Sequence, residues 1–129
     1  MTDPTGPRGR IEHVNLTVSD LDRSIALFER LLGWRLRLRD AHGVRGEFAH
    51  VGTHDDYLAL WSDGADHSGQ RKGRPMNHVG LQVDDLDAAE RVVRDAGLRP
   101  FGQGRYAPGP RTFYFLDWDG IEFEVVSYA

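Results

Sequence analysis

The chain contains no cysteine among its 129 residues. Disulfide bonds and thiolate chemistry are therefore excluded, and any metal ion would have to be held by histidine and carboxylate side chains. The sequence also lacks an apolar run near the ~18 residues that a membrane-spanning helix needs, and its mean hydropathy is −0.51. We therefore expect a protein without a membrane partner.

An excess of positive charge is also missing. The 20 acidic and 16 basic residues give a net charge of −4, whereas nucleic-acid binding requires a clustered basic surface. We therefore expect no nucleic-acid partner. The opening segment MTDPTGPRGR lacks the apolar stretch of a secretory signal, which predicts a cytoplasmic protein. A chain of this length builds one core, so we predict a single domain over residues 1–129.

An internal repeat organises the chain. Residues 11–21 (IEHVNLTVSDL) align with residues 76–86 (MNHVGLQVDDL), which lie 65 positions later in the chain. Apolar residues alternate in both segments, which is the period of a half-buried strand. Each strand leads into a predicted helix, and the helices end near Gly33 and Gly97. Ser19 and Asp22 fit a capping box at the start of the first helix.

Short strands are predicted after each helix. They lie at residues 34–39, 46–51 and 57–61, then near residue 99 and at 112–116 and 121–127. The pattern predicts an α+β fold of two βαβββ modules, at about residues 10–64 and 75–129, joined by a linker over residues 62–75. The sequence DWDG at residues 117–120 predicts a tight hairpin turn before the last strand.

Three metal-competent side chains fall on one predicted face. His13 and His78 occupy equivalent positions in the repeat, opposite the apolar residues of their strands. Phe123 and Val125 leave Glu124 on the same side as the histidines. A lone strand histidine more often has a structural role, but the repetition favours a metal site. Two imidazoles and a carboxylate suit one divalent ion of Fe, Mn, Zn, Ni or Co and leave coordination positions open.

The same offset compares the remaining positions of the two modules. It places Ala59 where the second module has Glu124, and it pairs Phe48 with Phe113. An alanine cannot bind a metal ion. The sequence therefore predicts a three-ligand site with a vacant fourth corner.

The motifs resemble those of the vicinal oxygen chelate superfamily, which includes glyoxalases, bleomycin resistance proteins and extradiol dioxygenases. The resemblance rests on the two repeated segments and on FYFLDWDGIEFEV at residues 113–125, and it covers nearly the whole chain. It implies a curled mixed β-sheet cup with the helices outside, and His13, His78 and Glu124 as metal ligands. It also implies a homodimer in which different subunits can contribute His13 and His78. Ala59 sets the chain apart from four-ligand glyoxalase I.

Further residues are predicted around the metal. Tyr114 precedes Glu124 by ten residues. At this position the chain resembles extradiol dioxygenases and fosfomycin-resistance transferases, which carry a tyrosine near the bound substrate, and the resemblance therefore predicts that Tyr114 is catalytic. The residues expected to contact substrate are Asn15, His50, Tyr57, Ala59, Trp61, Gln82 and Arg111. Tyr57 and Trp61 would form an aromatic wall or simply fill the vacant corner. Arg111 follows a Gly- and Pro-rich stretch and would clamp an anion, or stay exposed without that role.

Two functions stay open at this point. The first is a divalent-metal-dependent enzyme of dioxygenase, lyase or transferase type, acting on a small substrate chelated through neighbouring oxygens. The second is a protein that sequesters an antibiotic or an aromatic metabolite in the cup without chemistry, with the ligands retained as a relic.

Overall fold

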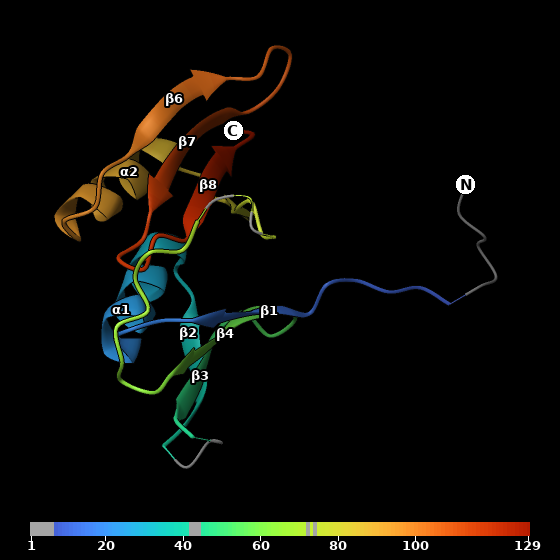
Figure 1. The fold of residues 1–129 in the computed structure, drawn as a ribbon. Helices are drawn as coiled ribbons and strands as arrows, with labels where there is room; N and C mark the ends of the chain where they lie inside the picture. Colours follow the sequence, from blue (N-terminus) through green and yellow to red (C-terminus); the bar gives the residue numbers. More distant parts are fainter. Residues whose placement is uncertain (1–6, 42–44, 72, 74) are drawn as a thin grey trace.

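The computed structural model describes residues 7–41, 45–71, 73 and 75–129 and shows two four-stranded sheets and two helices (Figure 1). The elements are β1 (His13–Thr17), α1 (Leu21–Leu32), β2 (Arg35–Asp40), β3 (Glu47–Gly52), β4 (Tyr57–Ser62), β5 (Val79–Gln82), α2 (Leu86–Asp95), β6 (Phe101–Arg105), β7 (Arg111–Leu116) and β8 (Glu122–Ser127). They confirm the predicted α+β fold of two βαβββ modules. Among the described residues, no helix has the length and apolarity needed to span a membrane.

The two modules have the same topology. Sheet A has the order β1-β4-β3-β2, and sheet B has the order β5-β8-β7-β6. In each sheet the first pair is parallel and the other pairs are antiparallel. Within the described part of the chain, no strand of sheet A pairs with a strand of sheet B. The single curled sheet expected around the site is therefore not formed within one chain.

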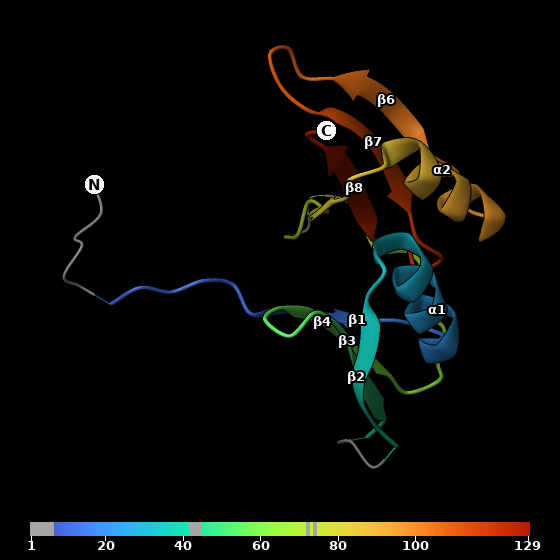
Figure 2. The same ribbon diagram turned by 180° about the vertical axis from the view of Figure 1, so that it is seen from behind.

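The helices join the modules through an apolar contact. α1 and α2 lie side by side on the same side of the molecule in both views (Figures 1 and 2). Phe28 of α1 also contacts Phe123 of β8, with ring centroids 5.2 Å apart. Both side chains are buried in one core that includes residues of both modules. Removal of this apolar surface from water, rather than strand pairing, holds the modules together.

A polar contact also connects the modules, and it changes the predicted start of α1. The N-cap of α1 is Asp20, whose side chain accepts the backbone N–H of Arg23 at 3.0 Å, so the predicted capping box of Ser19 and Asp22 is wrong. Ser19 instead donates its backbone N–H to Oδ2 of Asp119 at 3.1 Å and its hydroxyl to Oδ1. Asp119 is 1% exposed, so its buried carboxylate requires such partners. Ser19 therefore serves the contact between the modules.

The hairpin of the second module is one residue longer than that of the first. Residues 53–56 connect β3 to β4, whereas residues 117–121 connect β7 to β8. Consequently each residue of β3 corresponds to the residue of β7 that lies 64 positions later, so that residue 47 corresponds to residue 111. The last strands of the modules, β4 and β8, keep the offset of 65. The predicted pairing of Phe113 with Phe48 is therefore wrong. The counterpart of Phe113 is Ala49, and both are fully buried.

The shifted offset also gives His50 a new counterpart. His50 pairs in register with Ala59, and Tyr114 pairs in register with Glu124. His50 is thus the counterpart of Tyr114. It lies beside Ala59 in the first module, as Tyr114 lies beside Glu124 in the second. Loop length is not visible as periodicity within either strand, so the repeat in the sequence did not reveal this equivalence.

The turn before β8 contains a buried aspartate whose ionisation opposes folding. Asp117 is 6% exposed and accepts the backbone N–H groups of Asp119 and Ile121, both at 2.9 Å. Burial raises the pKa of Asp117 from 3.8 to about 6 despite these hydrogen bonds. The folded state therefore holds this proton more tightly than the unfolded state. Protonation of Asp117 therefore stabilises the folded state fully below about pH 4, and this stabilisation is lost as the pH rises through about 6.

We expect Asp117→Asn to flatten this pH dependence. The amide oxygen can still accept both backbone N–H groups, while the buried charge is removed. At pH 7 the free energy of unfolding should rise, by at most about 3 kcal/mol for a shift of roughly two pKa units. Urea denaturation between pH 4 and pH 7 measures this, with Asp55→Asn in the exposed turn of the first module as control. Parallel pH profiles for wild type and Asp117→Asn would contradict the prediction.

Candidate metal centre

Each candidate histidine ligand is oriented by the residue immediately before it. Nδ1 of His13 donates to Oε1 of Glu12 at 3.0 Å, and Nδ1 of His78 donates to Oδ1 of Asn77 at 2.8 Å. An acceptor at Nδ1 keeps the proton there and leaves the lone pair of Nε2 free for a metal ion. Sequence reasoning missed Glu12 and Asn77, although they occupy equivalent positions in the repeat. Both histidines are thus arranged as Nε2 donors.

Glu124 lies beside one of these free nitrogens. Its Oε1 is 3.2 Å from Nε2 of His78, and the Glu124 side chain is 13% exposed. Two donors at ~2.1 Å from one cation and at a right angle to each other lie about 3 Å apart. The spacing of this pair therefore fits adjacent positions on one divalent ion.

The second oxygen of Glu124 is held by hydroxyl groups. Thr112 donates to Oε2 at 2.9 Å, and Tyr106 donates to the same oxygen at 3.2 Å. Burial alone would raise the pKa of Glu124, but hydrogen bonds from Thr112, Tyr114 and Tyr106 and the charge of His78 lower it. The side chain is therefore a carboxylate at neutral pH, with Oε1 turned toward His78.

Sequence reasoning did not identify Thr112 or Tyr106. Thr112 alternates with the apolar residues of β7, so its place on the face of Glu124 could have been inferred from the strand period. Tyr106 follows β6 in the β6–β7 hairpin, and its hydroxyl reaches Glu124, eighteen residues further along the chain. No periodic signal in the sequence announces that return.

Tyr114 is held as a proton donor. Its hydroxyl hydrogen-bonds with that of Tyr106, and its ring lies edge-on to the ring of His78 at 5.9 Å. The hydrogen bond with Tyr106, burial and the nearby Glu124 raise the pKa of Tyr114 above its usual value. A phenol that keeps its proton at neutral pH donates a hydrogen bond and does not serve as a base.

Several predicted substrate residues meet on the open face of sheet A, the face away from α1. Tyr57 stacks on His13 at 5.0 Å and on His50 at 4.4 Å, and its hydroxyl donates to Oε1 of Glu12 at 3.2 Å. Burial and the positive charges of Arg37 and His13 lower the pKa of His50. Its imidazole is therefore neutral at pH 7.

Other predicted residues lie further along the same sheet. Ala59 is buried between its neighbours and pairs with His50 and Asn15 on either side. Asn15 and Trp61 line an open pocket together with residues such as Met76 and Asp119. On sheet B, Gln82 is exposed and pairs with Val126.

The structure places Arg111 away from the other predicted site residues. This residue belongs to β7 and not to a loop, and it lies on the face of that strand opposite Thr112 and Tyr114. Its guanidinium donates to Oδ1 of Asp87 on α2 at 3.0 Å. Strand alternation thus directs Arg111 to the helix side of sheet B, away from Glu124.

One chain does not assemble the three predicted ligands. His78 and Glu124 lie together on sheet B, while His13 belongs to sheet A. In the part of the chain that the structure describes, no group of three or more His, Cys, Asp or Glu residues could hold a metal ion. Within one chain, His13 is therefore not grouped with His78 and Glu124.

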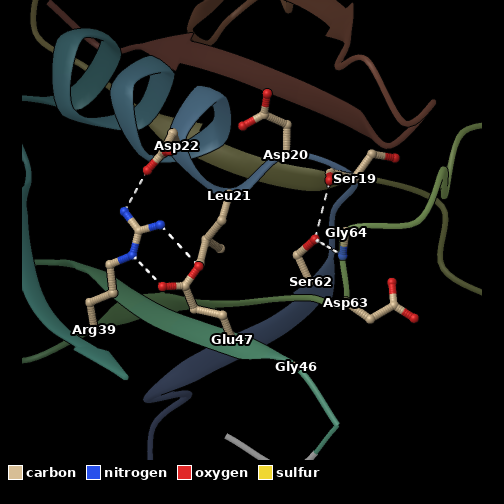
Figure 3. Close-up of a pocket in the computed structure, with 10 residues that line it drawn as sticks. All are labelled: Ser19, Asp20, Leu21, Asp22, Arg39, Gly46, Glu47, Ser62, Asp63 and Gly64. Atoms are coloured by element: carbon tan, nitrogen blue, oxygen red, sulfur yellow. Dashed lines mark hydrogen bonds and ion pairs between the residues drawn. The ribbon is translucent and has the colours of Figure 1, made fainter. Parts of the chain in front are cut away.

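A separate pocket lies at the start of α1 (Figure 3). Arg39 bridges Glu47, at 2.9 and 3.0 Å, and Asp22, at 2.5 Å. These hydrogen bonds raise the pKa of Arg39. None of the predicted metal or substrate residues lines this pocket, and its one arginine is neutralised by two carboxylates. The candidate metal centre therefore lies elsewhere, on the open faces of the sheets.

The hydroxyl of Thr112 is expected to support metal binding through Glu124. Thr112→Val keeps the shape of the side chain but removes the hydrogen bond to Oε2. Loss of such a supporting bond typically weakens metal binding by roughly 10- to 100-fold, which competition with a fluorescent chelator can measure. The same change at Thr17, exposed on β1, is the control. An unchanged metal affinity for Thr112→Val would exclude this supporting role.

The chain thus combines two βαβββ modules with a histidine in β1, a second histidine directly before β5 and a carboxylate in β8. Residues 10–125 match the sequence profile of the Glyoxalase/Bleomycin resistance protein/Dioxygenase superfamily, and the chain belongs to this superfamily.

Relatives and a solved structure agree with this membership. The chain is 30% identical to a lactoylglutathione lyase of Neisseria meningitidis serogroup A, over 92% of this chain and 90% of the relative. It is 27% identical to the glutathione transferase FosA of Serratia marcescens, over 89% and 78%. A glyoxylase/bleomycin resistance protein/dioxygenase domain from Frankia sp. EAN1pec is similar in structure, with a TM-score of 0.79, 26% identity and coverage of 95% and 100%.

Proposed function

We propose that the chain is a divalent-metal-dependent enzyme of lyase or transferase type, with His13, His78 and Glu124 as metal ligands. Its substrate is a small molecule that chelates the metal through neighbouring oxygens. The carrying observation is that an acceptor beside Nδ1 of each histidine favours the tautomer that presents Nε2, and that Nε2 of His78 lies 3.2 Å from Oε1 of Glu124. The names of the lyase and transferase relatives support the reaction type.

We propose further that the complete site forms between two copies of the chain. Sheet A of one protomer would bring His13 to His78 and Glu124 of sheet B in the other, around a twofold axis. Apolar side chains exposed on the open faces support this assembly, because exposed apolar surface marks interfaces. They are Leu38 on sheet A, 48% exposed, and Phe101 and Leu116 on sheet B, 36% and 45% exposed.

Within that site the residues of the chain would divide the work. The bound metal would act as a Lewis acid on a substrate oxygen. Tyr114, which keeps its proton, would exchange its hydrogen bond with Tyr106 for one donated to negative charge that develops on the substrate. His50 is neutral at pH 7 and lies beside Ala59, so it can accept a proton at the corner where a fourth ligand is missing. Ala59 makes ordinary four-ligand glyoxalase I chemistry the less favoured alternative.

Metal analysis and turnover test the proposal together. We expect about one divalent ion per chain in the purified wild type, and its loss in Glu124→Ala but not in Glu90→Ala on α2, which lies outside the candidate site. The substrates to assay are methylglyoxal with glutathione, fosfomycin with glutathione, and catechol. Metal-dependent turnover of one of them supports an enzyme. A metal-free wild type that binds aromatic compounds tightly would instead support a sequestering protein.

A further inference from the structure

An arginine that sequence reasoning did not select lies on the open face of sheet A. The register of β2 and β3 shifts between Leu36 and Leu38, which leaves Arg37 outside the regular pairing. Such a bulge re-aims a side chain. The guanidinium of Arg37 lies over the ring of Tyr57, with Cζ 4.3 Å from the ring centroid. The bulge thus directs a positive charge over the aromatic surface of the candidate site.

The charge of Arg37 differs from those of Arg39 and Arg111 in having no carboxylate partner among the described residues. Arg39 on the same strand binds two carboxylates (Figure 3), and Arg111 binds Asp87. For Arg37, no carboxylate lies within 4.0 Å among the residues that the structure describes. The guanidinium of Arg37 can therefore bind an anionic ligand without first breaking an ion pair.

The carboxylate that is hydrogen-bonded to Tyr57 is already engaged by other donors and does not compete with an anionic ligand. Glu12 is the nearby acid, and its Oε1 already accepts from His13 and Tyr57. The positive charge of Arg37 is also one of the causes, after burial, of the lowered pKa of His50. An anionic group above this face would therefore meet a guanidinium with donors to spare and a neutral imidazole.

We propose that Arg37 binds an anionic group of the substrate, a carboxylate, phosphonate or phosphate, with Tyr57 and His50 forming the aromatic surface beside it. The planar guanidinium can donate two parallel hydrogen bonds to two oxygens of such a group. Arg37 therefore takes the role expected of Arg111. This inference rests on the proposed function, because it names the substrate class of the same site.

Titration with phenylphosphonate tests the inference in the full-length protein. Isothermal titration calorimetry is performed on chelator-treated and on Mn²⁺-supplemented protein, with benzyl alcohol as a neutral comparison. Arg37→Gln should raise the Kd for phenylphosphonate roughly tenfold or more and leave that for benzyl alcohol unchanged. Arg111→Gln is the matched control and should leave both Kd values unchanged. Arg37→Lys keeps the positive charge but lacks the two parallel N–H donors of the guanidinium, so it should give an intermediate Kd for phenylphosphonate.

The possible outcomes separate this inference from the proposed function. An unchanged Kd in Arg37→Gln, or an equal loss in Arg111→Gln, would overturn the role of Arg37. If Arg37→Gln does not fold, as judged by circular dichroism, an unchanged Kd in Arg37→Lys overturns it and a weakened one supports it. Wild-type protein that retains no metal, but shows the Arg37 effect in the chelator-treated sample, would overturn the metal-dependent function and leave the anion site standing.

Discussion

A mixture of His13→Ala and Glu124→Ala chains is expected to regain metal binding that neither chain has alone. In the proposed dimer each site takes His13 from one protomer and His78 with Glu124 from the other. A mixed dimer then contains one site with both substitutions and one site with neither. Random pairing makes about half of the dimers mixed, so about one quarter of the wild-type metal content should return.

The control for this experiment uses two substitutions from the same side of the site. A mixture of His78→Ala and Glu124→Ala chains should stay metal-free, because every site in a mixed dimer lacks one of the two ligands. The chains are co-expressed so that they pair during folding, and metal is measured per chain after gel filtration. An empty His13→Ala and Glu124→Ala mixture, or a wild-type mass of one chain by light scattering, would show that the site does not form between protomers.

The second large effect is expected at the contact that joins the modules. Phe123→Ala should lower the free energy of unfolding by about 3–5 kcal/mol, the usual cost of removing a buried phenylalanine. Phe123 is fully buried, and its ring lies 5.2 Å from both Phe28 and Phe115. The substitution therefore opens a cavity both within sheet B and between sheet B and α1.

Chemical denaturation measures this loss, with Tyr128→Ala as the control. Tyr128 is 68% exposed, so its truncation should change the free energy of unfolding by less than about 0.5 kcal/mol. A loss below about 1 kcal/mol for Phe123→Ala would mean that the packing around this residue relaxes to fill the space. The contact with Phe28 would then not be the main link between the modules.

Much of the fold could be predicted from local patterns. Alternating apolar residues located most strands, although β6 begins at Phe101 and not near residue 99. Helical spacing with a terminal glycine located α1, whose C-cap is Gly33 with φ 64°. The repeat predicted two modules of equal topology, and the structure confirms them. Strand alternation also placed Glu124 on the face away from the core, beside His78. These features depend on residues a few positions apart, and such spacing is visible in the sequence.

The structure corrected what depends on the alignment of distant segments. A one-residue difference in hairpin length changed the counterpart of Phe113 and made His50 equivalent to Tyr114. Ser19 was drawn away from the helix cap by Asp119, one hundred residues further along the chain. Because a shift of one residue exchanges the two faces of a strand, such differences decide which side chains reach the site.

The sequence by itself determined the modules, the strand periods and the identity of the candidate metal donors. Tertiary structure decided that His13 and His78 lie on separate sheets, that Tyr106 and Thr112 hold Glu124, and that Arg37 rather than Arg111 lies on an open face. Side-chain alternation is set by the backbone of one strand. By contrast, the partners of a charged or polar side chain are set by whichever distant segment folding brings within hydrogen-bonding distance.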